Sequence, residues 1–449
     1  RVETDTLTGR GFDRDPFQAR LIAGDPTADP FGDLSTADFA RLPDDTANSV
    51  SEVLATELVL NGDVYELPAG GVSSTFKFGA DTRSLDSTSV RAGITTERSQ
   101  SRDRVNGQAS FSIPIASRRQ DVLPALGDLS ANFNVGYEEL SDFGGLSTLG
   151  FGVNWSPVEP LSLSLSYTDE NGAPSISQMN DPTISTFNVP VFDFATGETV
   201  LVTRTSGGNP GLSADNRQVW KAGFNLKPWS ETDFRIQSTW TRSLTEDAIA
   251  SFPSLTPDLE AALPGRFVRD AGGNLLSFDA RPLNFERFER QDIRTGFNYS
   301  RAFGTPTPQA EPAAGGRGGG GPPMRMMGGG RGGRGGGMMP GQGRFNLSIY
   351  HTWRLQDEIL IADGLPLLDL LDGAATGDRG GSPRHEIQAQ GGVFRNGMGA
   401  FVRANWSDGT RVDGGTGPDI TFADQATVNL NVFIDLNSRT SWVEKFPWL

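Results

Sequence analysis

Apolar and polar residues alternate one by one along many short stretches of this chain. From 129 to 137, for example, leucine, alanine, phenylalanine, valine and tyrosine alternate with serine, asparagine and glycine. The same alternation recurs over 105–115, 161–168 and 426–434. Successive side chains of a β-strand point to opposite faces, so this period of two predicts strands with one apolar face.

The pattern predicts about thirteen strands along the whole chain. Their approximate ranges are 53–65, 72–83, 104–115, 128–138, 148–155, 161–168, 217–227, 232–243, 291–303, 344–355, 384–394, 398–406 and 421–436. Short and long connections alternate between them, and the long ones are 1–50, 84–103, 169–216, 244–290 and 356–383. Bacterial outer-membrane barrels have short periplasmic turns and long extracellular loops, so this rhythm predicts which side each strand end faces.

The polar positions of these strands carry mostly Ser, Thr, Asn, Gln and Gly rather than Lys and Glu. Aromatic residues gather toward the strand ends, namely Trp155, Tyr167, Trp220, Trp229, Trp240, Tyr299, Trp353 and Trp406. An antiparallel transmembrane β-barrel gives both features, because its outside is apolar, its lumen is polar and aromatic rings gather at the two water–lipid boundaries. A large soluble all-β core is the alternative that the pattern leaves open.

Composition narrows the possible chemistry. The formal net charge of −16 argues against general nucleic-acid binding, which needs a basic surface. The chain has no cysteine, which excludes disulfides, thiolate zinc sites and cysteine nucleophiles. Its two histidines, His351 and His385, are interpreted as a structural strand residue and a loop-rim residue. We therefore expect no catalytic residues, no metal site and no cofactor, and we interpret the acidic clusters near the N-terminus as solvated loop charge.

The stretch 315–344 differs from everything around it. About half of it is glycine, and it carries arginines but no acid. It lies between two predicted strands, on the side where the other connections are short. We predict a disordered insertion over 304–343 that faces the periplasm within a barrel hairpin.

Several motifs, taken in order, resemble the barrel of a TonB-dependent outer-membrane receptor. They are the turn YELPAGGV at 65–72 followed by FGADTR at 78–83, the WSP at 155–157 followed by a strand and GAPSI at 172–176, and GNPGLSAD at 208–215. Asn171-Gly172 stands where the family usually has Phe-Arg, and Ala214-Asp215 where it has Pro-Glu. The glycine-rich insertion together with the strand HTWRLQDEILI at 351–361 resembles receptors of sphingomonad-like bacteria.

The resemblance implies that residues 1–449 are a partial barrel. Such receptors have about 22 strands around a separate N-terminal plug, so the predicted strands would be roughly the eighth to the twentieth. The chain begins at Arg1 without a methionine, and we expect an excerpt that lacks the plug.

The resemblance also implies a function. The chain would belong to a receptor and transporter in the outer membrane of a Gram-negative bacterium, surrounded by lipid. That receptor would bind a scarce small-molecule nutrient, which is a siderophore, cobalamin, a saccharide or a peptide. It would import that nutrient with energy from the TonB–ExbB–ExbD complex.

Candidate ligand-binding residues fall into two groups. Arg204, Asn209, Asp357 and Glu358 lie in predicted loops or at their rims, and Asn132, Asn134 and Arg235 lie at polar strand positions that would face the lumen. Asn209 precedes a proline within a glycine-rich stretch, so shaping a turn is a second role that its sequence context favours.

Three other functions remain open. A passive porin or autotransporter barrel would share the alternation but would have no plug. A nucleic-acid-binding protein would use the Arg–Gly stretch, although that stretch lacks the interleaved aromatic residues on which bases stack. A secreted β-rich adhesin is the third.

Overall fold

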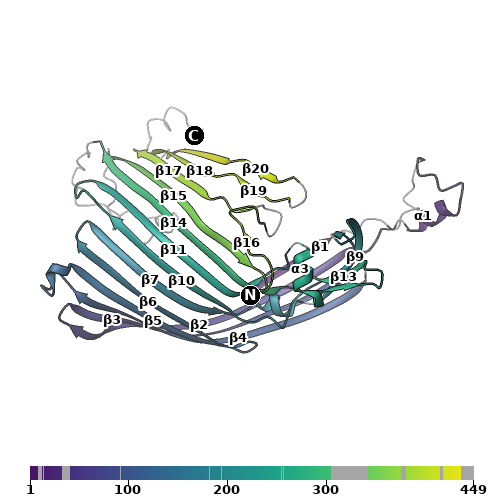
Figure 1. Cartoon of the computed structure of the whole chain (residues 1–449), viewed down its shortest axis with the longest axis horizontal. Helices are drawn as coiled ribbons and strands as arrows, with labels where there is room; N and C mark the ends of the chain where they lie inside the picture. Colours follow the sequence, from purple (N-terminus) through teal and green to yellow (C-terminus); the bar gives the residue numbers. More distant parts are fainter. Residues whose placement is uncertain are drawn as a thin grey trace, which may run out of the picture.

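The computed structural model describes residues 1–8, 13, 15–32, 41–91, 93–181, 183–193, 195–253, 255, 257–304, 342–375, 381–414 and 418–435. One large antiparallel sheet dominates these residues, and it curves across the whole molecule (Figure 1). Among them, no helix is both long enough and apolar enough to span a bilayer.

The large sheet is a meander in which each strand pairs with the strand of this sheet that follows it in the chain, with the small elements of the long connections left out of the order. Its strands in spatial order are β1 (Val2–Thr8), β2 (Asp45–Leu67), β3 (Gly70–Arg91), β4 (Ile94–Ala116), β5 (Asp128–Leu140), β6 (Gly144–Val158), β7 (Leu161–Gly172), β10 (Asp215–Leu226), β11 (Asp233–Ala250), β14 (Leu283–Phe303), β15 (Gly343–Leu360), β17 (His385–Arg395), β18 (Met398–Ser407) and β21 (Gln425–Ile434), with β16 (Leu368–Asp369) paired to β15. The thirteen predicted strands are therefore confirmed as β2 to β7, β10, β11, β14, β15, β17, β18 and β21. The all-β antiparallel fold class is confirmed with them.

One predicted loop is wrong. Residues 84–103 form no long connection, because β3 and β4 continue to pair residue by residue from Ser84 opposite Ser101 to Arg91 opposite Ile94. This stretch is polar on both faces, so it lacks the alternation by which the other strands were recognised. Backbone hydrogen bonds between strands form without an apolar face, so the β3–β4 hairpin can extend beyond the shorter strands beside it.

The two ends of the sheet differ. At one end, here called the turn end, short connections join β2 to β3, β6 to β7, β10 to β11 and β17 to β18. The opposite loop end carries the connections 173–214, 251–282, 361–384 and 408–424. The predicted alternation of short and long connections is thus largely confirmed. The connection between β14 and β15 falls at the turn end, as predicted, but its predicted disorder concerns residues 305–341, which lie outside the described residues.

The long connections carry structure of their own, which the sequence did not indicate. A small sheet forms from strands of two different connections, in the order β12-β13-β9-β8, with β13 and β9 parallel. The elements outside the large sheet are α1 (Asp15–Ile22), η1 (Pro124–Leu126), α2 (Ile176–Asn180), β8 (Ile184–Asp193), β9 (Glu198–Ser206), α3 (Pro257–Ala262), η2 (Pro264–Arg266), β12 (Phe267–Arg269), β13 (Leu275–Asp279), β19 (Thr410–Val412) and β20 (Ile420–Phe422). We call β8, β9, α3, η2, β12 and β13 the loop assembly, which Figure 1 shows at the lower right of the sheet.

Cross-strand register aligns the alternating residues of neighbouring strands into rows. Phe111, Phe133, Phe151, Tyr167 and Trp220 are successive partners from β4 to β10, so they share one face. We call this the apolar face and the other the polar face. Much of the apolar face is exposed, whereas the buried side chains gather at the loop end. There, one cluster contains Ala248, Leu259, Leu283, Phe285, Ile359 and Ile361, and a second contains Val202, Leu275, Phe278 and Ala280.

Candidate ligand-binding site

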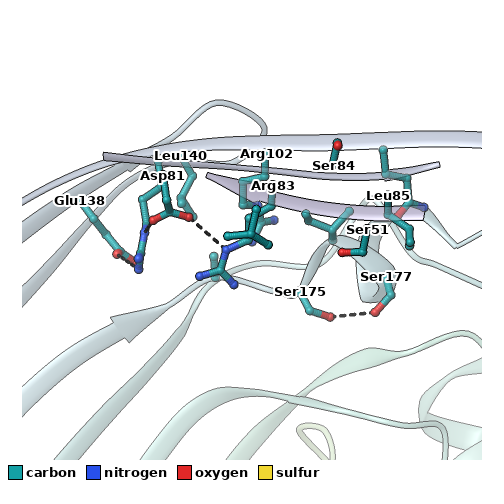
Figure 2. Close-up of a pocket in the computed structure, with 15 residues that line it drawn as sticks. Ser51, Asp81, Arg83, Ser84, Leu85, Arg102, Glu138, Leu140, Ser175 and Ser177 are labelled. Carbon is teal, nitrogen blue, oxygen red and sulfur yellow. Dashed lines mark hydrogen bonds and ion pairs between the residues drawn. The ribbon is translucent and has the colours of Figure 1, made fainter. Parts of the chain in front are cut away.

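A first cavity of about 470 Å³ opens at the loop end of β2 to β5 and reaches α2 (Figure 2). Arg83 and Arg102 are direct partners across β3 and β4, and Arg104 follows two residues later on β4. Three guanidinium groups therefore line one cavity, and we call it the arginine cavity. Like charges placed directly opposite each other destabilise a sheet, so each arginine needs a counter-charge.

Carboxylates supply those counter-charges. Asp81, whose side chain is only 6% exposed, accepts hydrogen bonds from Nε of Arg83 at 3.0 Å and from Nε of Arg104 at 2.5 Å. Arg102 donates through Nε and Nη2 to both oxygens of Asp142, at 2.7 and 2.8 Å. Glu138 lies 3.4 Å from Nη1 of Arg104. Each guanidinium has five N–H groups, so donors are left over that these contacts do not use.

The rest of the cavity lining mixes polar residues with apolar ones such as Leu140 and Ile176. Ser175 and Ser177 of the α2 turn face the cavity, and Ser175 caps that turn by accepting from the backbone N–H of Gln178. The buried Oε1 of Gln100, which also lines the cavity, has no hydrogen-bond partner within the described part of the chain. Spare guanidinium N–H groups and hydroxyls suit a ligand that is rich in acceptor oxygens.

A second cavity, of about 720 Å³, opens at the loop end of β10, β11, β14 and β15. Carboxylates outnumber arginines in its lining, which contains Asp215, Glu289, Asp292, Asp357 and Glu358 but only Arg217 and Arg290. Glu289 is largely buried and is neutralised by Arg242, whose Nη2 lies 2.6 Å from Oε1. The two cavities therefore differ in charge at the same end of the sheet.

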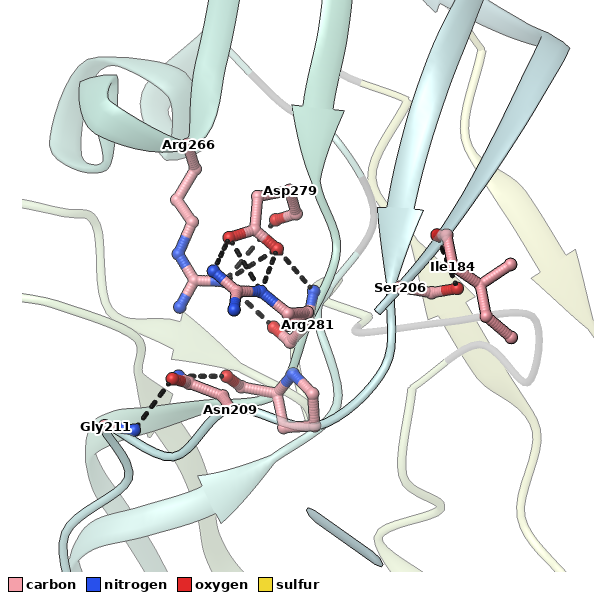
Figure 3. Close-up of polar contacts among 8 residues, drawn as sticks. Ile184, Ser206, Asn209, Gly211, Arg266, Asp279 and Arg281 are labelled. Atoms are coloured by element: carbon pink, nitrogen blue, oxygen red, sulfur yellow. Dashed lines mark hydrogen bonds and ion pairs between the residues drawn. The ribbon is translucent and has the colours of Figure 1, made fainter. Parts of the chain in front are cut away.

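A set of polar contacts ties the loops to the strands beside these cavities (Figure 3). Asn209 donates from Nδ2 to the carbonyl of Pro282 at 2.9 Å and accepts at Oδ1 from the backbone N–H of Gly211 at 3.0 Å. Arg281 donates through Nη2 to Asp279 at 2.7 Å. Burial alone raises the pKa of Asp279, but the hydrogen bonds from Arg281 outweigh it and hold that pKa below its ordinary value.

An ion triad locks the loop assembly itself. Arg269 of β12 donates to both oxygens of Asp193 at 2.8 Å and to both oxygens of Glu260 in α3, at 2.6 and 2.7 Å. Asp193 is 2% exposed. The hydrogen bonds from Arg269 are the main reason that the pKa of Asp193 falls to about 2, while its burial acts in the opposite direction. The triad joins β8, β12 and α3 into one body.

The structure separates the predicted site residues into three groups. Asp357 and Glu358 come together in the second cavity. Arg204 and Asn209 do not join them: Arg204 lies exposed on β9 within the loop assembly, and both polar side-chain atoms of Asn209 hold the loop conformation, as its turn context favoured. Asn132 and Asn134 share the polar face of β5, and Arg235 lies on the polar face of β11, 3.3 Å from Asp233. Ligand contact by these residues stays a prediction.

Sequence reasoning missed the three arginines of the first cavity. Gln100, Arg102 and Arg104 alternate with Ser101 and Asp103, which is a strand period. The predicted loop 84–103 contains Arg102, whereas Arg83 and Arg104 are the end residues of the two predicted strands on either side of it, so the prediction did not bring the three together.

No protein-family model and no curated protein matches this chain. Solved structures do match it. A mutant of the ferric enterobactin receptor PfeA from Pseudomonas aeruginosa aligns with 90% of this chain and 48% of its own length, at 12% identity and a TM-score of 0.52. Two further PfeA mutants, each in complex with enterobactin, align at 12% identity with TM-scores of 0.52 and 0.51, covering 88% and 95% of this chain. The chain has the fold of a TonB-dependent receptor barrel.

This receptor-barrel fold is shared with proteins about twice as long, since the chain spans about half the length of these PfeA structures. The fold agrees with the resemblance that the motifs indicated. The narrower resemblance to receptors of sphingomonad-like bacteria stays a prediction.

Proposed function

We propose that this chain forms part of the barrel of an outer-membrane receptor in a Gram-negative bacterium. The receptor captures a small nutrient molecule at the loop end and imports it through the lumen. The TonB–ExbB–ExbD complex supplies the energy. One observation carries this proposal. Two cavities lined by charged side chains and a folded loop assembly held by ion pairs lie at the same end of a receptor-barrel sheet.

The apolar face supports a position in the membrane. The rings of Tyr167 and Trp220 are in contact, with centroids 4.6 Å apart and planes tilted by 42°, and the ring centroid of Phe151 lies 5.3 Å from that of Tyr167. Two residues closer to the loop end, Asp169 accepts from the hydroxyl of Tyr167 at 3.2 Å. A row of aromatic residues with carboxylates beyond it, toward the loop end, is typical of a strand that crosses the boundary between lipid and water. The polar face then lines the lumen.

The arginine cavity favours an acceptor-rich ligand. Two of the matched structures hold enterobactin, so a ferric siderophore is the first ligand class to test. Cobalamin, a saccharide and a peptide remain the other classes. The second cavity, with its excess of carboxylates, suits the cationic or hydroxyl-bearing part of a ligand.

Ligand binding is tested with the full-length receptor in detergent and a panel that contains a ferric catecholate chelate, cobalamin, an oligosaccharide and a peptide. For the ligand that binds, we expect Arg83→Ala to raise the Kd about tenfold, since one charge-assisted contact contributes about 1.4 kcal/mol. Arg83 is a suitable choice because its side chain is half exposed and Asp81 keeps Arg104 as a partner.

The matched control is Arg118→Ala, which breaks an ion pair with Asp128 at the turn end. Binding that is equally weakened in both variants, or in neither, would contradict the assignment of the cavity. Uptake that persists in cells without TonB would contradict the energised mechanism.

A further inference from the structure

The polar face changes character at the turn end of β17, β18 and β21. Phe394, Phe401 and Phe433 lie there on the polar face, whereas glutamine, threonine and asparagine occupy the other polar-face positions of β21. Phe394 and Phe433 are both partners of Gly399, and Phe401 is the partner of Gly392. The ring of Phe433 lies 5.7 Å from that of Phe394 and 5.8 Å from that of Phe401, with interplanar angles of 22° and 10°. We call these three residues the phenylalanine patch.

The two glycines allow the rings to lie flat on the sheet. A Cβ atom at Gly399 would lie 2.6 Å from the ring of Phe433, and one at Gly392 would collide with the ring of Phe401. Phe401 is 40% exposed and Phe433 is 37% exposed. The patch is therefore an apolar platform on an otherwise polar wall, and such a surface favours association with a partner.

One segment of the same chain begins and ends beside this platform. β14 ends at Phe303 and β15 begins at Gly343, both at the turn end, and β15 pairs directly with β17. β21 is three strands from β15, which corresponds to about 15 Å at the usual strand spacing. Half of the connection between these two strands is about 18 residues, and a flexible chain of that length has a root-mean-square end-to-end distance of about 23 Å. A connection of this length is therefore long enough to reach the patch.

The composition of that segment matches the platform. Residues 315–341 contain five of the chain's seven methionines and four arginines, but no acid and no aromatic residue. Thioether sulfur atoms and guanidinium groups both interact favourably with aromatic rings. We propose that the phenylalanine patch is the docking site of segment 315–341 of this same chain. The proposal rests on the positions of these three phenylalanines on the polar face of the sheet, and it is independent of which ligand the loop end binds.

Photo-crosslinking of the full-length protein in outer-membrane vesicles tests the contact. The photoreactive residue p-benzoylphenylalanine replaces Phe401, which keeps an aromatic ring at that position, and mass spectrometry identifies the crosslinked peptide. Val402 is the matched control position, because it is the next residue on β18, is 42% exposed and faces the opposite side. We expect crosslinks to segment 315–341 from position 401 and none to it from position 402. Crosslinks from 401 that go only to other segments of the protein, or to lipid, would overturn the proposal.

Methionine oxidation gives a second and independent measurement. In the doubly substituted variant Phe401→Leu and Phe433→Leu, which keeps apolar side chains but removes two rings, we expect peroxide to oxidise the five methionines of the segment two to three times faster. Met398 is the internal control, since it lies on β18 outside the patch and its rate stays the same. Equal oxidation rates of the five methionines in the variant and the unaltered protein would also overturn the proposal.

Discussion

The wall of the large sheet and the loop assembly bury their apolar residues in opposite ways. In the wall, Phe133, Val135 and Phe151 remain exposed on the apolar face. In the loop assembly, by contrast, Val202, Leu259 and Leu275 are almost completely buried. The strands of the wall are held together by backbone hydrogen bonds, and their apolar side chains are not covered by other parts of the described chain. A sheet that lies in lipid is expected to have both features. The loop assembly has a core like that of a water-soluble domain.

Under the proposed function, this contrast corresponds to two surroundings, lipid at the apolar face and water at the loops. The apolar face needs no protein partner if lipid covers it, whereas the loop assembly is held by ion pairs and buried clusters, one of which includes residues at the loop ends of β11, β14 and β15. Damage to these clusters should therefore affect the loop assembly and those strand ends, and damage at the turn end of the wall should not spread to the loop assembly.

The largest effect is expected from Leu259→Ala. Leu259 is 1% exposed within the cluster that joins α3 to β14 and β15. Removing three buried carbons and leaving a cavity should lower the local stability of the loop assembly by about 4 kcal/mol. Hydrogen–deuterium exchange of β12 and β13 measures this. Leu201→Ala, at a position 66% exposed in the same assembly, should change exchange by less than about 0.5 kcal/mol. Equal effects of the two substitutions would mean that no such core exists.

The next largest effect is expected from Asp193→Asn. This change leaves the buried side of Arg269 without its full counter-charge and should cost about 3 kcal/mol in the stability of the loop assembly. Proteolysis of the loops in intact cells gives a simple measurement. Asp233→Asn, which alters an exposed ion pair with Arg235 in the wall, is the control, and protection of the loops should not change there.

A smaller effect is expected from pH alone. The pKa of Asp193 lies at about 2 in the folded chain, below the ordinary value of 3.8. A lowered pKa stabilises the folded form above pH 4, and that contribution is lost as the pH falls from about 4 toward 2. The loop assembly should thus lose about 1–2 kcal/mol over this window. Asp193→Asn should remove this dependence, and an unchanged acid profile in that variant would exclude Asp193 as its source.

The same contrast separates what the sequence could predict from what it could not. Alternation revealed the wall because each strand has one apolar face, as from Leu129 to Tyr137. It could not reveal the extension of β3 and β4, where Ser84 to Asp103 is polar on both faces. It also could not reveal the loop assembly, because parallel pairing of Ser277 with Thr203 joins two separate connections and leaves no local signal.

The candidate site was predictable only in part. Asp357 and Glu358 were expected in a loop; they lie in β15, which continues to Leu360, and they do line a cavity. Arg83, Arg102 and Arg104, by contrast, converge only through cross-strand register. Register depends on where a hairpin turns, and a single glycine, Gly93, is a weak sequence signal for a turn. For Asn209, the neighbouring proline and glycines correctly indicated a role in shaping the loop, because both polar side-chain atoms contact loop backbone.

Under the proposed function, lipid covers the apolar face and water reaches the polar face. The chain has no cysteine, so single cysteines test this directly in the full-length protein reconstituted into lipid. The changes Asn134→Cys and Val135→Cys place a thiol on neighbouring residues of β5 that face opposite sides. We predict that a membrane-impermeant maleimide labels the cysteine at position 134. A fluorophore attached at position 135 should instead be quenched by brominated lipid. Equal maleimide labelling of both positions, or lipid quenching at position 134 in place of 135, would contradict the account.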